Sequence, residues 1–236
     1  HLYNADDSTY IHDNIYYIYV YLSKHCGRCL EKFSSISKLF KIYQTPELTI
    51  KIIWEEETPP MRVLEKYEIS TESSLFMDKS VKLSSSVPKY YIVDDNNNVV
   101  FVDNTIKKIV EKIQSLDIVD NNTLFTNAAD YIVSSYVKQS GDDTIIYFTM
   151  EGCKDCQFAD TIIENIAKEH PFELIRIYSY HTEDPQRICD KDAIFLNALG
   201  IDWYPSFLIL TESGQSFIGR TEEDELESCI IDAFGK

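Results

Sequence analysis

The feature that most constrains the fold of this chain is a pair of cysteines, separated by two residues, that occurs twice in the same setting. The stretch "YLSKHCGRCLEKF" contains Cys26 and Cys29, and "YFTMEGCKDCQFAD" contains Cys153 and Cys156. Each pair follows an apolar run typical of a buried strand and leads into a helical pattern. The sequence therefore predicts one structural module present in two copies.

The residues around the two pairs predict elements in the same order. The first half is expected to contain a strand at 14–22, a helix at 29–43, a strand at 47–57, a helix at 58–69, a hairpin at 88–103 and a helix at 104–116. The second half is expected to contain a leading helix at 124–139, a strand at 143–150, a helix at 156–170, a strand at 172–180, a helix at 191–201, a hairpin at 205–219 and a helix at 222–234. Asn104 is a candidate N-cap of its helix. We expect two related α/β domains, 1–119 and 120–236.

Length and charge limit the classes of function. A chain of 236 residues with 44% hydrophobic content suits two domains with proper cores. Its formal net charge of −17 repels phosphate backbones, so nucleic acid is not an expected partner. No run approaches the ~20 apolar residues of a membrane span. The chain begins without an initiator Met, so we expect an upstream leader or anchor to have been removed and an extracytoplasmic location, either exported or membrane-anchored.

The spacing of each pair supports reversible disulfide chemistry. Positions i and i+3 on a first helical turn bring two Cα atoms within the range of about 4.4–6.8 Å that a disulfide needs. Backbone N–H groups at a helix start stabilise a thiolate on the first cysteine. Cys26 and Cys153 are therefore the expected nucleophiles, and Cys29 and Cys156 are expected to resolve the mixed disulfides that form.

The order strand, C-x-x-C at a helix start, strand, helix, proline-led hairpin and helix resembles the thioredoxin fold, and here it occurs twice. The matching motifs are Cys26-Gly27-Arg28-Cys29 with Val87-Pro88, and Cys153-Lys154-Asp155-Cys156 with Tyr204-Pro205. The resemblance covers nearly the whole chain apart from about the first dozen residues, the helix 124–139 and the stretch 58–87. It implies two tandem thioredoxin-fold domains, each with a central mixed sheet flanked by helices.

The resemblance also implies a function. In this family the proline is cis and lies against the cysteine pair, so Val87-Pro88 and Tyr204-Pro205 are expected to bind an extended substrate strand. The chain is similar to two-domain protein disulfide oxidoreductases and isomerase-like proteins. We therefore expect a thiol:disulfide oxidoreductase without a cofactor, whose partners are cysteine-containing proteins and a redox-recycling protein. The hairpin at 88–103 resembles that of extracytoplasmic thiol reductases.

The residues beside the cysteines are expected to tune the two sites unequally. Basic Arg28 and a protonated His25 favour the Cys26 thiolate. Lys154 and Asp155 oppose each other at the second site, and Glu151 adds negative charge. The Cys26 pair is therefore predicted to be the more oxidising.

Two features of the sequence keep other functions open. Thioredoxins commonly carry a buried acid six positions before the first cysteine and a Trp immediately before it. Val20 and Tyr147 replace the acid, and His25 and Gly152 replace the Trp. A non-catalytic thioredoxin-like binding or chaperone module is the alternative that these departures favour.

Metal binding is the less favoured alternative. Two C-x-x-C pairs can form a Cys₄ zinc site, but known sites separate the pairs by roughly 15–20 residues. Cys26 and Cys153 are 127 positions apart, 153 minus 26, so no metal is expected. Cys229 is predicted to be a buried structural thiol. Cys189 is expected where a loop enters a helix, either as a reactive thiol or as an inert, partly buried one. We expect no disulfide between these two.

Overall fold

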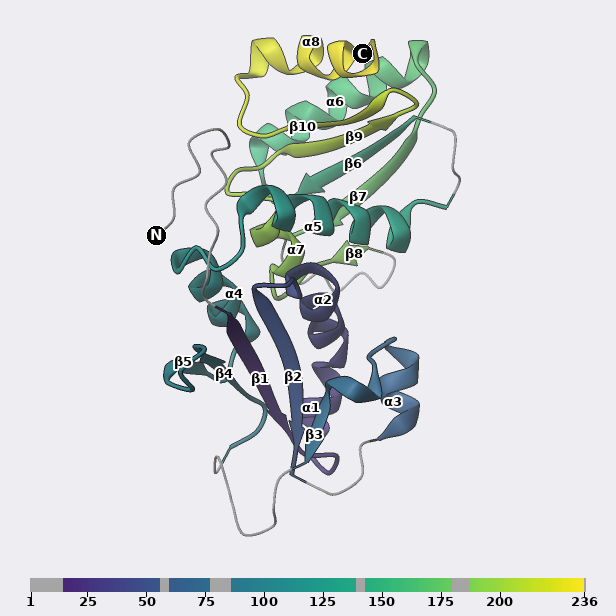
Figure 1. The fold of residues 1–236 in the computed structure, drawn as a ribbon. Coiled ribbons are helices and arrows are strands. Elements are labelled where there is room, and N and C mark those ends of the chain that lie inside the picture. The colour runs from purple at the N-terminus through teal and green to yellow at the C-terminus, as the bar shows by residue number, and fades with distance from the viewer. Residues whose placement is uncertain (1–14, 56–59, 77–85, 139–142, 180–186, 236) are drawn as a thin grey trace, which may run out of the picture. The chain divides into compact units, whose positions relative to one another are not determined.

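The computed structural model describes residues 15–55, 60–76, 86–138, 143–179 and 187–235 (Figure 1). The predicted elements that extend to residues 14, 56–59, 139 and 180 have those ends outside the described residues. Residue contacts divide the chain into two compact units, His1–Leu124 and Phe125–Lys236. The boundary predicted after residue 119 lies just before this division.

The N-terminal unit contains a mixed sheet of five strands. In their order across the sheet these are β3 (Ser74–Phe76), β2 (Leu48–Trp54), β1 (Tyr16–Leu22), β4 (Lys89–Val93) and β5 (Val99–Asp103). β1 is parallel to β2 and antiparallel to β4, which makes it the central strand. Burial alternates strictly along β2, where every second side chain is buried, as expected of a strand with one face on the core.

The helices of this unit are α1 (Gly27–Glu31), α2 (Phe33–Tyr43), α3 (Met61–Lys66) and α4 (Ile106–Ser115), with a 3₁₀ turn, η1 (Thr71–Ser73). The single helix predicted at 29–43 is divided at Lys32, which ends α1 and precedes α2. Leu30, expected on the same apolar face as Phe33 and Ile36, is exposed, whereas those two are fully buried. Because of this division, α1, which contains Cys29, does not continue the apolar face of α2.

The predicted cap of α4 is wrong. Thr105, not Asn104, occupies the N-cap position, and its side chain makes no capping hydrogen bond. The carboxylate of Asp103 instead accepts hydrogen bonds from the backbone N–H and the hydroxyl of Thr105, at 2.9 and 2.5 Å. An Asx turn thus leads the chain from β5 into the helix.

The C-terminal unit repeats the sheet of the first. Its strands, in order, are β10 (Gly214–Ile218), β9 (Ser206–Thr211), β6 (Thr144–Thr149), β7 (Glu173–Tyr178) and β8 (Ile188–Cys189). β6 is parallel to β7 and antiparallel to β9, as β1 is to β2 and β4. The edge strands β3 and β8 are absent from the elements predicted by sequence, because two or three residues are too few to show a period.

The helices of this unit are α5 (Asn121–Tyr136), which begins in the preceding unit, α6 (Lys154–Glu169), α7 (Ile194–Ala198) and α8 (Glu223–Phe234). Figure 1 shows α6 and α8 on one face of the sheet and α5 and α7 on the other. Tyr131 of α5 packs on Phe195 of α7, with ring centroids 6.1 Å apart. Apolar side chains of α6, α8, β6 and β9 form one continuous core. Two mixed five-stranded sheets flanked by helices are the two thioredoxin-like α/β domains expected from the sequence.

One edge of the first sheet is exposed and apolar. β5 is the terminal strand of its sheet, and Val99, Val100 and Val102 are 59%, 39% and 41% exposed.

Among the described helices, none combines the length and the apolar character needed to cross a membrane.

Candidate functional site

Cys26 occupies the N-cap position of α1, directly after the turn that follows β1. Its sulfur accepts a hydrogen bond from the backbone N–H of Cys29 at 3.2 Å. Cys26 is partly exposed, whereas Cys29 is fully buried. The structure therefore presents the first sulfur to solvent and keeps the second behind it, as expected of a nucleophile and a resolving thiol.

Cys153 is placed in the same way at the start of α6. Its sulfur accepts a hydrogen bond from the N–H of Cys156 at 3.0 Å, and Cys156 is buried. A disulfide joins these two cysteines, with their Cα atoms 5.2 Å apart. Cys26 and Cys29 are in the dithiol form.

In each domain the first cysteine lies against the backbone that precedes a proline. The thiol of Cys26 lies 3.7 Å from the carbonyl oxygen of Val87, and the sulfur of Cys153 lies 3.9 Å from that of Tyr204. The Val87–Pro88 and Tyr204–Pro205 peptide bonds are both cis. The predicted nucleophiles and the predicted substrate-binding residues are thus brought together, although 61 and 51 positions of sequence separate them.

The tuning residues of the first site lie on its open side. His25 and Arg28 are exposed, and the backbone N–H of His25 donates to the hydroxyl of Ser23 at 3.3 Å. Apart from the chain neighbours of Gly27 and the backbone of its own helix, no described atom lies within 4 Å of the point where a Cβ would sit on this residue. A substrate backbone can therefore approach Cys26 from this side.

The second site contains a cation that the sequence analysis missed. Arg187 forms an ion pair with Glu151 and stacks over the ring of Tyr178, 4.7 Å from its centroid. The negative charge that Glu151 was expected to add near Cys153 is thus offset. No local motif signals this contact, because Arg187 enters the site from a loop 36 positions away.

Tyr147 occupies the position where thioredoxins carry their buried acid. It is fully buried in β6, and its hydroxyl donates to the backbone carbonyl of Cys156 at 2.9 Å. Burial raises the pKa of Tyr147 to about 12, so this phenol is a neutral donor and not a base at neutral pH. The corresponding Val20 is buried and apolar.

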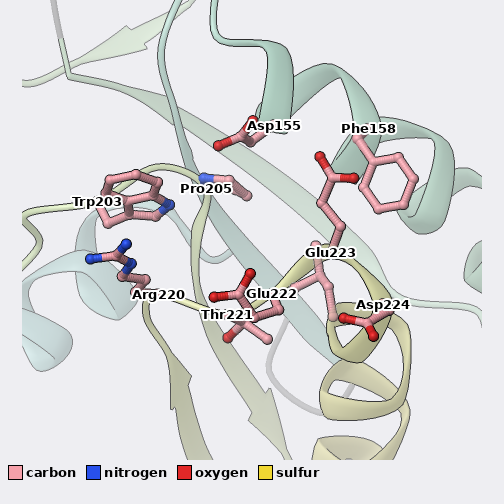
Figure 2. A pocket seen from close by; sticks show the side chains of 10 residues that line it. Asp155, Phe158, Trp203, Pro205, Arg220, Thr221, Glu222, Glu223 and Asp224 are labelled. Atoms are coloured by element: carbon pink, nitrogen blue, oxygen red, sulfur yellow. The ribbon is translucent and has the colours of Figure 1, made fainter.

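A groove of about 450 Å³ borders the second site (Figure 2). It lies between the start of α6, the loop that contains Pro205 and the start of α8. It is lined by Asp155, Phe158, Trp203, Pro205, Arg220, Thr221, Glu222, Glu223, Asp224 and Leu226. Of the predicted site residues only Asp155 and Pro205 belong to it. Lys154 is exposed and does not line it.

The other flank of the same cysteine pair is also open. A second cavity of about 270 Å³ contains both Cys153 and Cys156 in its wall, together with Glu151, Arg187 and Asp160. The Asp160 carboxylate forms an ion pair with Arg176 of β7 at 3.1 Å. Both sides of the pair are thus accessible to another molecule.

The remaining cysteines differ from their predicted settings. Cys189 lies in the edge strand β8, not at the start of a helix, and is partly exposed. Cys229 lies on α8 and packs against the core, but it is only partly buried. The structure does not join them.

Comparisons with known proteins find no matching family model and no matching curated protein. Among solved structures, the chain is similar to a thioredoxin-like protein from Parabacteroides distasonis at 10% identity. That match covers 43% of this chain and 81% of the other, with a TM-score of 0.34.

Two further structures are similar. One is a thiol:disulfide interchange protein of the thioredoxin family from Chlorobium tepidum, at 14% identity over 44% of this chain and 81% of the other, with a TM-score of 0.37. The other comprises the first two thioredoxin domains of Naumovozyma dairenensis Eps1p, at 10% identity over 92% of this chain and 90% of the other, with a TM-score of 0.25.

Proposed function

From two thioredoxin-like domains, each with a C-x-x-C pair at a helix start, we propose that this chain is a thiol:disulfide oxidoreductase that acts on cysteines of other proteins. One observation carries the proposal. In both domains the sulfur of the first cysteine accepts an N–H of the helix start, and it lies 3.7 or 3.9 Å from the carbonyl that precedes a proline. Two independent copies of this arrangement support a redox role better than either copy alone.

The proposed exchange proceeds in two displacement steps. The thiolate of Cys26 or Cys153 attacks one sulfur of a substrate disulfide, whose S–S bond breaks and whose other sulfur leaves as a thiolate. The second cysteine, deprotonated, then attacks the first and releases the remaining substrate thiolate. The pair ends as a disulfide and the substrate has gained two electrons. The reverse sequence oxidises a substrate dithiol.

Substrate recognition is proposed to use the backbone beside each proline. An extended segment can add to the chain at Val87 or Tyr204, where the adjacent carbonyl already faces the attacking sulfur. We further propose a separate redox partner that restores the starting state of each pair. A compartment outside the cytoplasm is the proposed location, since protein disulfides persist there.

A binding or chaperone module is the second candidate, and one observation favours it. Neither domain has a titratable base at the position six residues before its first cysteine, where buried Val20 and Tyr147 stand. A module of this kind would use the same groove and proline loop without turnover.

A glutathione redox titration, read by thiol alkylation and intact mass, tests the proposal. It uses the full chain, the Cys26→Ser variant, the Cys153→Ser variant and, as a control, the Cys229→Ser variant. The expected result is two reversible two-electron steps, each lost only with its own variant. Pairs that stay reduced throughout would instead support the binding module, and alkylation that requires a chelator would support a metal site.

A further inference from the structure

The groove of Figure 2 lies beside the second redox pair, and its lining is charged. Asp155, between the two cysteines, forms part of its wall, and so does Pro205. The carbonyl that precedes Pro205 lies 3.9 Å from the sulfur of Cys153. A polypeptide held at that sulfur therefore has its neighbouring side chains next to this groove.

The charges that line the groove are mostly negative. Its ionisable side chains are four carboxylates, of Asp155, Glu222, Glu223 and Asp224, and one guanidinium, of Arg220. Arg220 lies over the ring of Trp203, 4.5 Å from its centroid. Within the described part of the chain, no ion pair joins any of the four carboxylates to a cation. The groove thus carries an excess of three negative charges.

The carboxylate at the start of α8 is not engaged in capping that helix. Glu222 occupies the N-cap position of α8, yet its side chain makes no capping hydrogen bond. Figure 2 shows the carboxylates of Asp155, Glu222 and Glu223 around Pro205. Because the carbonyl that precedes Pro205 lies 3.9 Å from the Cys153 sulfur, we expect a side chain next to the reacting substrate cysteine to come close to these carboxylates.

The groove also offers apolar surface. Phe158 is 41% exposed and Trp203 is 38% exposed, on opposite sides of the cavity. Lysine and arginine combine a long aliphatic stem with a terminal cation, so they can contact an aromatic ring and a carboxylate at once. Few other side chains match both properties of this groove.

We propose that this groove selects, for the Cys153–Cys156 site, polypeptide substrates that carry a lysine or arginine close to the reacting cysteine. The inference rests on the proposed thiol–disulfide exchange and specifies its substrate class. Complementary charge acts mainly on the rate of encounter, and added salt screens it. The selection should therefore appear as a salt-sensitive difference in second-order rate constant.

The test uses the full chain with Cys26→Ser, Cys29→Ser and Cys156→Ser, which leaves Cys153 as the reacting thiol of the two motifs. The substrates are two peptides of equal length, each with one cysteine in mixed disulfide with thionitrobenzoate, flanked by two lysines in one and by two glutamates in the other. The Cys153 thiolate attacks the peptide sulfur, the S–S bond breaks, and the coloured thionitrobenzoate leaves. At low salt we expect the lysine peptide to react roughly tenfold faster, and the ratio to fall in high salt.

Charge variants assign the effect to the groove. Glu222→Gln with Glu223→Gln and Asp224→Asn should bring the ratio close to one. A control with Glu164→Gln, Glu227→Gln and Asp232→Asn removes three exposed carboxylates outside the groove and should keep the ratio. Arg220→Gln removes the single cation and should increase it. Equal rates for both peptides, or equal loss in both triple variants, would overturn the inference.

A small uncharged disulfide separates this inference from the function on which it rests. The mixed disulfide of mercaptoethanol and 2-thiopyridine carries no charge at neutral pH, so it should react with Cys153 at the same rate in all groove variants. No reaction with this probe would contradict the proposed function itself. Reaction with it, but no preference between the peptides, would contradict only the groove.

Discussion

The hydroxyl of Tyr147 donates a hydrogen bond to the backbone carbonyl of Cys156, at 2.9 Å, inside the core of the C-terminal domain. It links the central strand β6 to the first turn of α6, on which the redox pair is placed. The ring of Tyr147 also stacks on Phe207 of β9, with centroids 5.0 Å apart. A tyrosine here serves to fix the position of the helix start, which an apolar residue such as Val20 in the other domain cannot do through a hydrogen bond.

Tyr147→Phe should destabilise the C-terminal domain by about 1 kcal/mol at neutral pH, because it removes one buried hydrogen bond and keeps the ring. Chemical denaturation of the oxidised protein measures the change. Tyr178→Phe is a suitable control, since that residue is only partly buried. A loss below about 0.3 kcal/mol would contradict a structural role for this hydrogen bond.

The same variant should change the stability of the protein at alkaline pH. The pKa of Tyr147 is raised from 10.0 to about 12 by burial, so its neutral form is favoured in the folded state. Its contribution is complete below pH 10 and is lost between pH 10 and 12, where the unfolded chain ionises first. Over this range wild type should lose up to about 1.4 kcal/mol per pH unit relative to Tyr147→Phe. Tyr19 and Tyr136, whose pKa values burial also raises, are present in both proteins and cancel. Parallel pH profiles would contradict this linkage.

The two redox pairs are predicted to differ in potential, with the Cys26 pair the more oxidising. Arg28 lies in the first motif, whereas Lys154 and Asp155 offset each other in the second. Equilibrium with glutathione should give a higher fitted potential for the pair that remains in Cys153→Ser than for the pair that remains in Cys26→Ser. Equal or reversed potentials would reject the prediction.

The ion pair between Arg187 and Glu151 adds a further test at the second site. Arg187→Gln removes a cation from the cavity that contains Cys153 and leaves Glu151 unneutralised. The thiolate form of Cys153 and Cys156 should then be less stable, which disfavours the reduced pair. The reduction potential of the Cys153 pair should therefore fall. The potential of the Cys26 pair serves as the internal reference and should not change.

Asp120 caps α5, so Asp120→Ala should fray the start of that helix at a cost of about 1 kcal/mol. Its carboxylate accepts hydrogen bonds from the N–H groups of Asn122 and Thr123, at 2.9 and 3.2 Å, and from the Thr123 hydroxyl. The bond from that hydroxyl holds the pKa of Asp120 below its ordinary value, so the cap persists at neutral pH and is lost as acid protonates it. Hydrogen exchange at the two amides should accelerate in Asp120→Ala and stay slow in Asp120→Asn. Unchanged exchange in the alanine variant would show that tertiary packing alone holds the helix start.

Cys189 and Cys229 should both be alkylated in protein that is denatured without reduction. Cys189 lies in β8, and α8, which carries Cys229, packs near β9 and β10 at the other side of the sheet. β6 and β7 lie between β8 and β9. Three strand spacings of about 4.8 Å therefore separate β8 from β9 by about 14 Å. A disulfide needs Cα atoms within about 6.8 Å. Mass spectrometry of fully oxidised protein should therefore show two alkylation adducts. A spectrum without adducts would contradict the placement of these strands.

The sequence predicts the elements that have a long period or a strong boundary. β1 and β6 are apolar runs. The cysteine pairs mark the helix starts that follow them, and Pro88 and Pro205 mark the starts of the hairpins, so the element order of both domains could be inferred. The break of α1 and α2 at Lys32 could not, because the apolar period continues through it at Leu30.

Within the site, the parts supplied by distant loops were missed. Arg187 reaches Glu151 across 36 positions, and Trp203 and Arg220 meet only because β9 and β10 pair between them. The failure at Asn104 has a local cause. α4 begins one residue later than expected, after the Asx turn of Asp103, and the Asn104 side-chain amide donates to the hydroxyl of Ser86 at 3.5 Å instead of capping the helix.

The exposed edge at β5 has a consequence for handling this protein in solution. Among the described strands β5 pairs only with β4, so its outer edge, with Val99, Val100 and Val102 exposed on the strand, is a template on which a second molecule can add a strand. The formal charge of −17 keeps molecules apart by colloidal repulsion at neutral pH. Acidification protonates the carboxylates and removes that repulsion while the valines remain. Mildly acidic, high-salt buffers are therefore the conditions in which this edge would drive precipitation.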